Sequence, residues 1–123
     1  MAKKILFIED ESALQRAVTS ILSEGGYQVL SALDGETGLK LAGTELPDLI
    51  LLDIVLPKKD GFEVLTELKK GEATKGIPVI ILTNLEQNED VERVLSLGAT
   101  TYLVKTNYRL EEVMEKIKQT LKD

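Results

Sequence analysis

The sequence contains no cysteine and no histidine in its 123 residues. This absence excludes disulfide bonds, zinc-finger sites and catalysis by a thiol or an imidazole. Any reactive chemistry must therefore use carboxylate, hydroxyl or amine groups, or a metal ion that such groups hold.

The chain also lacks an excess of basic residues and a long apolar segment. Its 15 Lys and Arg residues face 21 Asp and Glu residues, which gives a net charge of -6. No basic stripe is available to neutralise phosphates, so we expect no direct contact with nucleic acid. Only residues 5–8 separate Lys4 from Glu9, too few for a signal-peptide core, and no apolar run approaches the length of a membrane span. We therefore expect a cytoplasmic protein without membrane contact.

Short apolar runs alternate with longer amphipathic segments along the chain. At 123 residues and 43% hydrophobic content, we expect a single domain, residues 1–123, with one continuous core. Five strand-helix units with right-handed crossovers predict an α/β fold, a doubly wound parallel sheet with helices on both faces. The predicted strands are residues 5–8, 27–32, 49–52, 79–82 and 103–104, and the predicted helices are 14–22, 36–42, 62–68, 89–97 and 110–121.

The apolar stripes of these helices are most simply explained as core packing. In the first helix the stripe includes Ala17 and Val18, and in the fourth it includes Val91, Val94 and Leu95. The glycines at residues 25–26 and 98 are predicted helix ends, at which the chain can adopt a positive φ.

Polar residues directly follow four of the apolar runs. Glu9 and Asp10 come after residues 5–8, Asp53 after 49–52, Thr83 after 79–82 and Lys105 after 103–104. The carboxyl ends of parallel strands meet at one edge of the sheet, where such folds bind their ligands. The sequence therefore predicts a metal and phosphoryl site at this edge.

Three carboxylates, those of Glu9, Asp10 and Asp53, would repel one another if strands one and three are neighbours. Mg²⁺ prefers oxygen ligands and would balance their charge. An alternative is that residues 10–12 merely cap the first helix, because acidic residues are common at helix starts. Asp53 has no helix directly behind it, since Pro57 and Gly61 intervene, so capping explains little there.

A carboxylate beside a divalent ion can attack phosphorus and form an acyl phosphate. We assign this role to Asp53. Lys105 can pair with a phosphoryl oxygen, and the Thr83 hydroxyl can donate to another. Taken singly, Lys105 would be a solvated surface lysine and Thr83 an ordinary strand end; their joint position at consecutive strand ends favours the site.

Together, these residues make the whole chain resemble a response-regulator receiver domain of two-component signalling. The resemblance covers residues 3–121. The resemblance implies a flavodoxin-like sheet of five parallel strands in the order 2-1-3-4-5 with five helices. The motifs that carry it are residues 5–11 (ILFIEDE), 51–53 (LLD), 56–61 (LPKKDG), Thr83 and 98–105 (GATTYLVK).

The resemblance implies a signalling switch rather than an enzyme. Asp53 would accept a phosphoryl group from a sensor kinase phosphohistidine, with Glu9, Asp10 and the backbone carbonyl of Val55 at Mg²⁺. Thr83 would then move toward the phosphoryl group and Tyr102 would rotate inward, changing the surface of helix four, strand five and helix five. The expected partners are a histidine kinase or phosphotransfer protein and a downstream protein that the sequence does not name.

Several positions depart from the usual receiver pattern. Thr106 replaces the proline that commonly follows the lysine, and Asn84 replaces a smaller residue. Residues 100–101 are threonines where one large transcription-factor subfamily carries dimer-forming acids, so we expect a monomer or a weak dimer. Val55 and Leu85, two residues beyond Asp53 and Thr83, cannot orient a water molecule, so we expect slow self-dephosphorylation.

Other functions remain as alternatives. An aspartate-nucleophile phosphatase uses similar groups, but such enzymes carry Asp-x-Asp after strand one, whereas this chain has Asp10-Glu11-Ser12. A receiver-like scaffold that binds partners without phosphorylation is the other alternative. Dinucleotide binding is disfavoured because no G-x-G-x-x-G occurs, and the glycine-rich residues 71–76 read as a turn. The chain ends just after the last predicted helix, so we expect either a protein that acts through a partner or a domain of a longer one.

Overall fold

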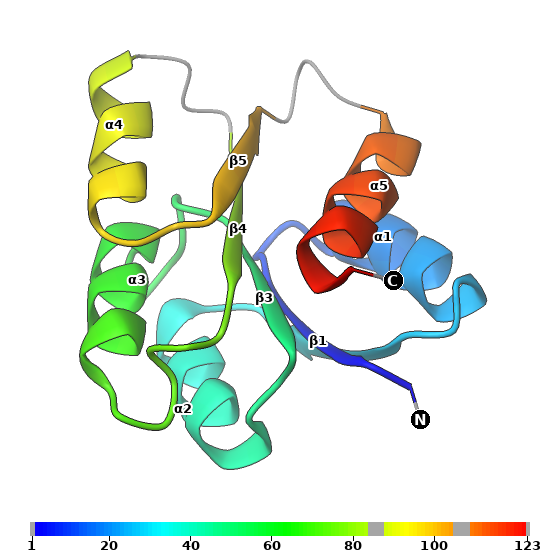
Figure 1. Ribbon diagram of the computed structural model, residues 1–123, viewed down its shortest axis with the longest axis horizontal. Helices are drawn as coiled ribbons and strands as arrows, with labels where there is room; N and C mark the ends of the chain where they lie inside the picture. The colour runs from blue at the N-terminus through cyan, green and yellow to red at the C-terminus, as the bar shows by residue number, and fades with distance from the viewer. Residues whose placement is uncertain (1, 84–87, 105–108, 123) are drawn as a thin grey trace.

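The computed structural model describes residues 2–83, 88–104 and 109–122 of the chain. They form five strands and five helices in strict alternation, as drawn in Figure 1. The strands are β1 (Lys4–Ile8), β2 (Gln28–Ala32), β3 (Leu49–Leu52), β4 (Val79–Thr83) and β5 (Thr101–Val104). The helices are α1 (Ser12–Glu24), α2 (Gly35–Glu45), α3 (Gly61–Lys70), α4 (Asn88–Ser96) and α5 (Leu110–Leu121).

All strand pairs are parallel, and the sheet order is β2-β1-β3-β4-β5. This confirms the order implied by the resemblance. The register aligns Ile8 with Ala32 on one side and with Leu52 on the other. The residues that follow β1 and β3 therefore leave the sheet at the same level. This alignment determines where the predicted site residues after the two strands lie.

Helices cover both faces of the sheet. Figure 1 shows α1 and α5 on one side and α2, α3 and α4 on the other. The two core clusters follow this division: one contains Val18 of α1 and Ile117 of α5, and the other contains Ala42 of α2, Leu65 of α3 and Val94 of α4. Because both faces are covered, the central strands are apolar along their length, as the short continuous runs predicted.

The second helix is longer than the predicted segment 36–42, since it runs from Gly35 to Glu45. Asp34 caps it by accepting a hydrogen bond from the Thr37 backbone N–H at 2.8 Å. This bond also lowers the pKa of the Asp34 carboxyl below its ordinary value. Gly38 lets the helix approach β1 closely, because a Cβ there would lie 2.5 Å from the Ile8 Cδ1 atom. Neither contact is visible in helical periodicity.

Core packing was predicted correctly for most of the helical stripes but not for two residues. Leu95 of α4 is 43% exposed, and Ala17 of α1 is exposed as well. Val18 and Val94, which directly adjoin Ala17 and Leu95 in the sequence, are buried, and successive residues are turned about 100° apart around the helix axis. The predicted glycine stops are confirmed at Gly26, with φ 91°, and at Gly98, with φ 106°.

No helix in the described ranges is both long and apolar enough to cross a membrane.

Candidate functional site

The backbone of β1 and β3 carries the first two acidic residues to the same place. The Glu9 N–H donates to the Ala32 carbonyl at 3.0 Å, and the Asp53 N–H donates to the Ile8 carbonyl at 3.0 Å. These bonds extend the parallel ladder one residue beyond the strand ends. Both acidic residues are therefore held by the sheet itself.

The three predicted carboxylates do come together. Glu9, Asp10 and Asp53 each offer an oxygen atom, and these atoms all lie within 4.8 Å of one another. Glu9 and Asp53 are 0% and 3% exposed, whereas Asp10 is exposed. Two unit charges 4 Å apart repel by about 4 kcal/mol at an effective dielectric constant near 20. Such a cluster of hard oxygen ligands, open to solvent on one side, suits a divalent cation.

The capping alternative for residues 10–12 is not supported. The N-cap residue of α1 is Glu11, and its side chain makes no capping hydrogen bond. Glu9 Oε2 instead accepts from the Glu11 backbone N–H at 3.1 Å. At this helix start the carboxylate that accepts a backbone N–H is therefore that of Glu9, which precedes residues 10–12.

Asp53 is oriented by the two residues that follow it. Its Oδ1 atom accepts from the Ile54 N–H at 2.7 Å and from the Val55 N–H at 3.4 Å. Val55, two residues beyond Asp53, is 64% exposed. A carboxylate held by backbone amides has a fixed plane, which favours a defined direction of attack.

Gly61 is a site residue whose role the sequence reasoning missed. Its N–H donates to the Ile54 carbonyl at 2.7 Å, which folds the loop after β3 back onto that strand. A Cβ at this position would lie 2.5 Å from the Asp53 carbonyl oxygen and 2.4 Å from the Ile54 Cα atom. Its signals in the sequence were its place at the end of the motif 56–61 (LPKKDG) and just before a predicted helix.

The loop between β3 and α3 is braced from two further directions. The Gly35 N–H donates to the Pro57 carbonyl at 3.4 Å, which joins the start of α2 to this loop. Lys59 Nζ lies 2.6 Å from Glu67 Oε2, and this hydrogen bond raises the pKa of Lys59 above its ordinary value. The loop that follows Asp53 is thus attached to both neighbouring helices.

Gln15 is a second support that the sequence reasoning missed. Its Nε2 atom donates to the carbonyls of Phe7 at 3.0 Å, Glu9 at 3.2 Å and Ala32 at 3.1 Å. The side chain is 5% exposed and ties the carboxyl ends of β1 and β2 to α1. Its signal was a polar residue directly beside the apolar stripe of the first helix.

The other predicted site residues are described only in part. Thr83 ends β4, where it pairs with Val104, but its side chain lies outside the described part of the structure. Tyr102 of β5 is half-buried and packs against the core cluster beneath α2, α3 and α4. Lys105 lies outside the described residues, as do Asn84, Leu85 and Thr106.

The family model named response regulator receiver domain matches residues 5–118. This chain belongs to the response-regulator receiver family. A DNA-binding dual master transcriptional regulator, RpaA of Synechocystis sp., is 40% identical over 97% of this chain and 49% of that protein. The receiver domain spans about half the length of the curated relatives that it matches.

Solved structures agree with the fold. A CheY-like receiver domain protein from Methanospirillum hungatei has a TM-score of 0.92 and is 31% identical, with 99% of this chain and 95% of that one covered. The receiver domain of the sensor histidine kinase PA1611 from Pseudomonas aeruginosa has a TM-score of 0.90 and 28% identity over 100% of both chains. That structure has a magnesium ion coordinated in its active-site cleft.

The contact at Gly61 generates a prediction about stability. We expect Gly61→Ala to lower the free energy of unfolding by about 1–3 kcal/mol, because the added methyl group would overlap backbone atoms that cannot move aside. The matched control is Gly43→Ala in α2, where a Cβ would meet nothing within 4 Å. That change should stabilise the helix by up to about 1 kcal/mol. Urea denaturation of both variants measures the difference, and equal effects would contradict the close approach.

Proposed function

We propose that Asp53 of this receiver domain accepts a phosphoryl group from the phosphohistidine of a sensor kinase or of a phosphotransfer protein. The observation that supports this most is the convergence of Glu9, Asp10 and Asp53 at the edge of the sheet. Asp53 is central to the cluster because it alone follows β3, the middle strand of the sheet.

The transfer follows from the carboxylate chemistry. A carboxylate oxygen of Asp53 attacks the phosphorus atom, and a new O–P bond forms as the N–P bond of the phosphohistidine breaks. The bonding electron pair returns to the imidazole nitrogen of the donor, which then takes up a proton. The backbone N–H groups of Ile54 and Val55 hold Oδ1 throughout, so the acyl phosphate forms in a defined orientation.

The donor set fits a divalent cation such as Mg²⁺. Three carboxylates lie within reach of one another, and the backbone carbonyl of Val55 is the fourth ligand that we assign. When bound, the cation would offset the negative charge of the carboxylates and of the incoming phosphoryl oxygens. Asp10 is exposed, so this proposed ligand is accessible from solvent.

Three further residues complete the proposed switch. Lys105 pairs with a phosphoryl oxygen, and the Thr83 hydroxyl donates to another. Tyr102 of β5 changes its orientation when the domain is phosphorylated. Its side chain is suited to this role because it packs against the core cluster that also contains Val94 of α4. The resulting change of the α4, β5 and α5 surface is read by a downstream protein, in the cytoplasm, with the domain acting as a monomer or a weak dimer.

The phosphoacceptor assignment is tested with acetyl phosphate and MgCl2, read out by intact-protein mass spectrometry. We expect the protein to gain one phosphoryl group and Asp53→Asn to gain none, because an amide is not a nucleophile toward phosphorus. Asp48→Asn is the matched control, since it precedes β3 whereas Asp53 follows it. Continuous turnover of acetyl phosphate would favour the phosphatase alternative, and an unmodified wild-type protein would favour the scaffold.

The metal assignment predicts a loss of cation affinity at Asp10. We expect Asp10→Asn to weaken Mg²⁺ binding by about tenfold or more, because one of three charged ligands is neutralised. Isothermal titration with MgCl2 measures this change, and Glu11→Gln serves as the control beside the cluster. Equal affinities in the two variants would remove Asp10 from the metal site.

The side chain of Val55 predicts a long-lived acyl phosphate. Val55 is exposed, and its hydrocarbon side chain cannot orient an attacking water molecule. The side chain of Leu85 is a hydrocarbon as well. We expect the Val55→Asn, Leu85→Glu double variant to lose its phosphoryl group faster than the wild type. Decay followed by mass spectrometry gives both lifetimes, with Leu46→Asn as a control at an exposed leucine elsewhere. A longer lifetime in the double variant contradicts the assignment.

A further inference from the structure

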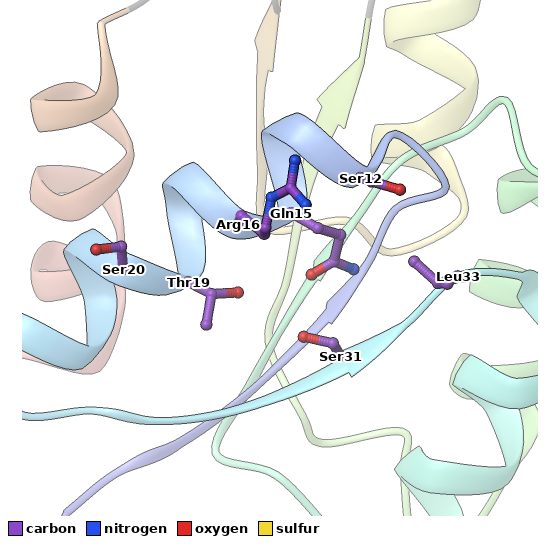
Figure 2. Close-up of a pocket in the computed structure, with 7 residues that line it drawn as sticks. All are labelled: Ser12, Gln15, Arg16, Thr19, Ser20, Ser31 and Leu33. Atoms are coloured by element: carbon purple, nitrogen blue, oxygen red, sulfur yellow. The ribbon is translucent and has the colours of Figure 1, made fainter.

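The acidic edge of the sheet is supported from two sides. On the β1 side the support is Gln15, whose side chain extends from α1 toward the strands in Figure 2 and donates to the carbonyls of residues 7, 9 and 32. On the β3 side the support is the segment of residues 54–61, which leads from Asp53 into α3. This second support contains a strained residue, Lys58.

Lys58 adopts a backbone conformation that most side chains disfavour. Its φ is 68°, and the Lys59 N–H donates to the Pro57 carbonyl at 2.8 Å. A hydrogen bond of this span around a residue with positive φ defines the classic γ-turn, which is rare and strained. The other residues besides glycine that have a positive φ in the described ranges, Leu46 and Lys122, are helix C-caps. Left-handed geometry is common at a helix C-terminus, but Lys58 lies in a loop between a strand and a helix.

The surroundings of the turn hold this conformation in place. On one side the Gly35 N–H donates to the Pro57 carbonyl at 3.4 Å, and a Cβ at Gly35 would overlap the Lys59 carbonyl. On the other side Lys59 Nζ lies 2.6 Å from Glu67 Oε2 of α3. Lys58 itself is exposed, so contacts of its neighbours fix the turn. Strain of this kind persists only where the surrounding structure fixes it, and it is concentrated at functional sites.

The turn closes a loop that reaches the Asp53 carboxylate. The Gly61 N–H donates to the Ile54 carbonyl at 2.7 Å, so residues 55–60 must reverse the direction of the chain. The γ-turn makes this reversal within three residues. The N–H of the same Ile54–Val55 peptide group donates to Asp53 Oδ1 at 3.4 Å. Loop closure therefore fixes the plane of a peptide group that holds the Asp53 carboxylate.

The preceding peptide group, between Asp53 and Ile54, is held by the same closure. Its N–H donates to Asp53 Oδ1 at 2.7 Å. Its carbonyl oxygen lies so close to Gly61 that a Cβ there would be 2.5 Å away. Both peptide groups that bind Oδ1 thus rest against Gly61 on their other side.

We propose that the strained turn at Lys58 positions the Asp53 carboxylate for attack on phosphorus. The turn seats Gly61 against the two peptide groups that follow Asp53, and these groups hold Oδ1. Lys58 is a positioning residue through its backbone conformation, and its ammonium group takes no part. This inference rests on the proposed role of Asp53 as the phosphoryl acceptor.

Substitutions at Lys58 separate the backbone conformation from the side chain. Glycine adopts a positive φ readily, whereas proline fixes φ at about −65° and cannot form the turn. The rate of phosphoryl gain from acetyl phosphate with MgCl2 is measured by intact-protein mass spectrometry. We expect Lys58→Gly to react within about twofold of the wild type and Lys58→Pro to react about tenfold or more slowly, because a small misplacement of a reacting group is costly.

Hydrogen exchange of the Gly61 amide tests the loop closure without a phosphoryl donor. Exchange should be faster in Lys58→Pro than in the wild type and unchanged in Lys58→Gly. If Lys58→Pro does not fold, Lys58→Val replaces it, because a β-branched side chain strongly disfavours a positive φ. Leu46→Val is the matched control at another exposed residue with positive φ, at the end of α2 that is remote from Gly35. It should change neither the phosphorylation rate nor the exchange of Gly61.

The possible results separate this inference from the proposed function. A folded Lys58→Pro or Lys58→Val variant that reacts as fast as the wild type, or that keeps the wild-type exchange of Gly61, overturns the inference and leaves the role of Asp53 intact. A slow Lys58→Gly variant also overturns it, because the effect would then belong to the ammonium group. A wild-type protein that gains no phosphoryl group overturns both.

Discussion

The pairing of β1 with β3 is the interaction on which the candidate site depends. Parallel strands buried on both faces tolerate little slippage, because a shift of one residue would turn every side chain to the opposite face. The register that aligns Ile8 with Leu52 therefore also fixes the level at which Glu9 and Asp53 leave the sheet. The Glu9 N–H bonds to the Ala32 carbonyl and the Asp53 N–H bonds to the Ile8 carbonyl, so the backbone of both acidic residues is held in the same alignment.

Two buried contacts around the sheet edge convert this alignment into a fixed geometry. Gln15 joins α1 to the ends of β1 and β2 through three hydrogen bonds. Gly61 brings the start of α3 against the backbone of Asp53, so the loop after β3 cannot move away from the cluster without disturbing a helix. The mutual repulsion of the carboxylates is thus opposed by packing and backbone hydrogen bonds on both sides.

The sequence predicted the sheet and the acidic cluster because both depend on local patterns. A short apolar run followed by an acidic residue marks a buried strand and its carboxyl end within a few positions. The contacts of Gln15, Gly38 and Gly61 join a helix to a strand end or to the loop after a strand, and periodicity within one element does not report contacts between elements. The exposure of Leu95 was missed because Val91 is partly buried only 40° away around the helix, so periodicity alone did not separate the two. The roles of Thr83 and Lys105 stay predictions.

The attachment of α4 differs from that of its neighbour α3. Three apolar residues of α3 other than glycine are buried, Val64, Leu65 and Leu68, whereas among the described side chains of α4 only Val94 is. The Arg93 guanidinium stacks on the Phe62 ring at 3.8 Å, a contact that can re-form in a shifted position. Exposing one aliphatic side chain costs about 1.5–3 kcal/mol. A single new hydrogen bond to a charged group is worth a similar amount. Among the described side chains, α4 is therefore attached to the sheet by less buried apolar surface than α3, and displacing it would cost less free energy.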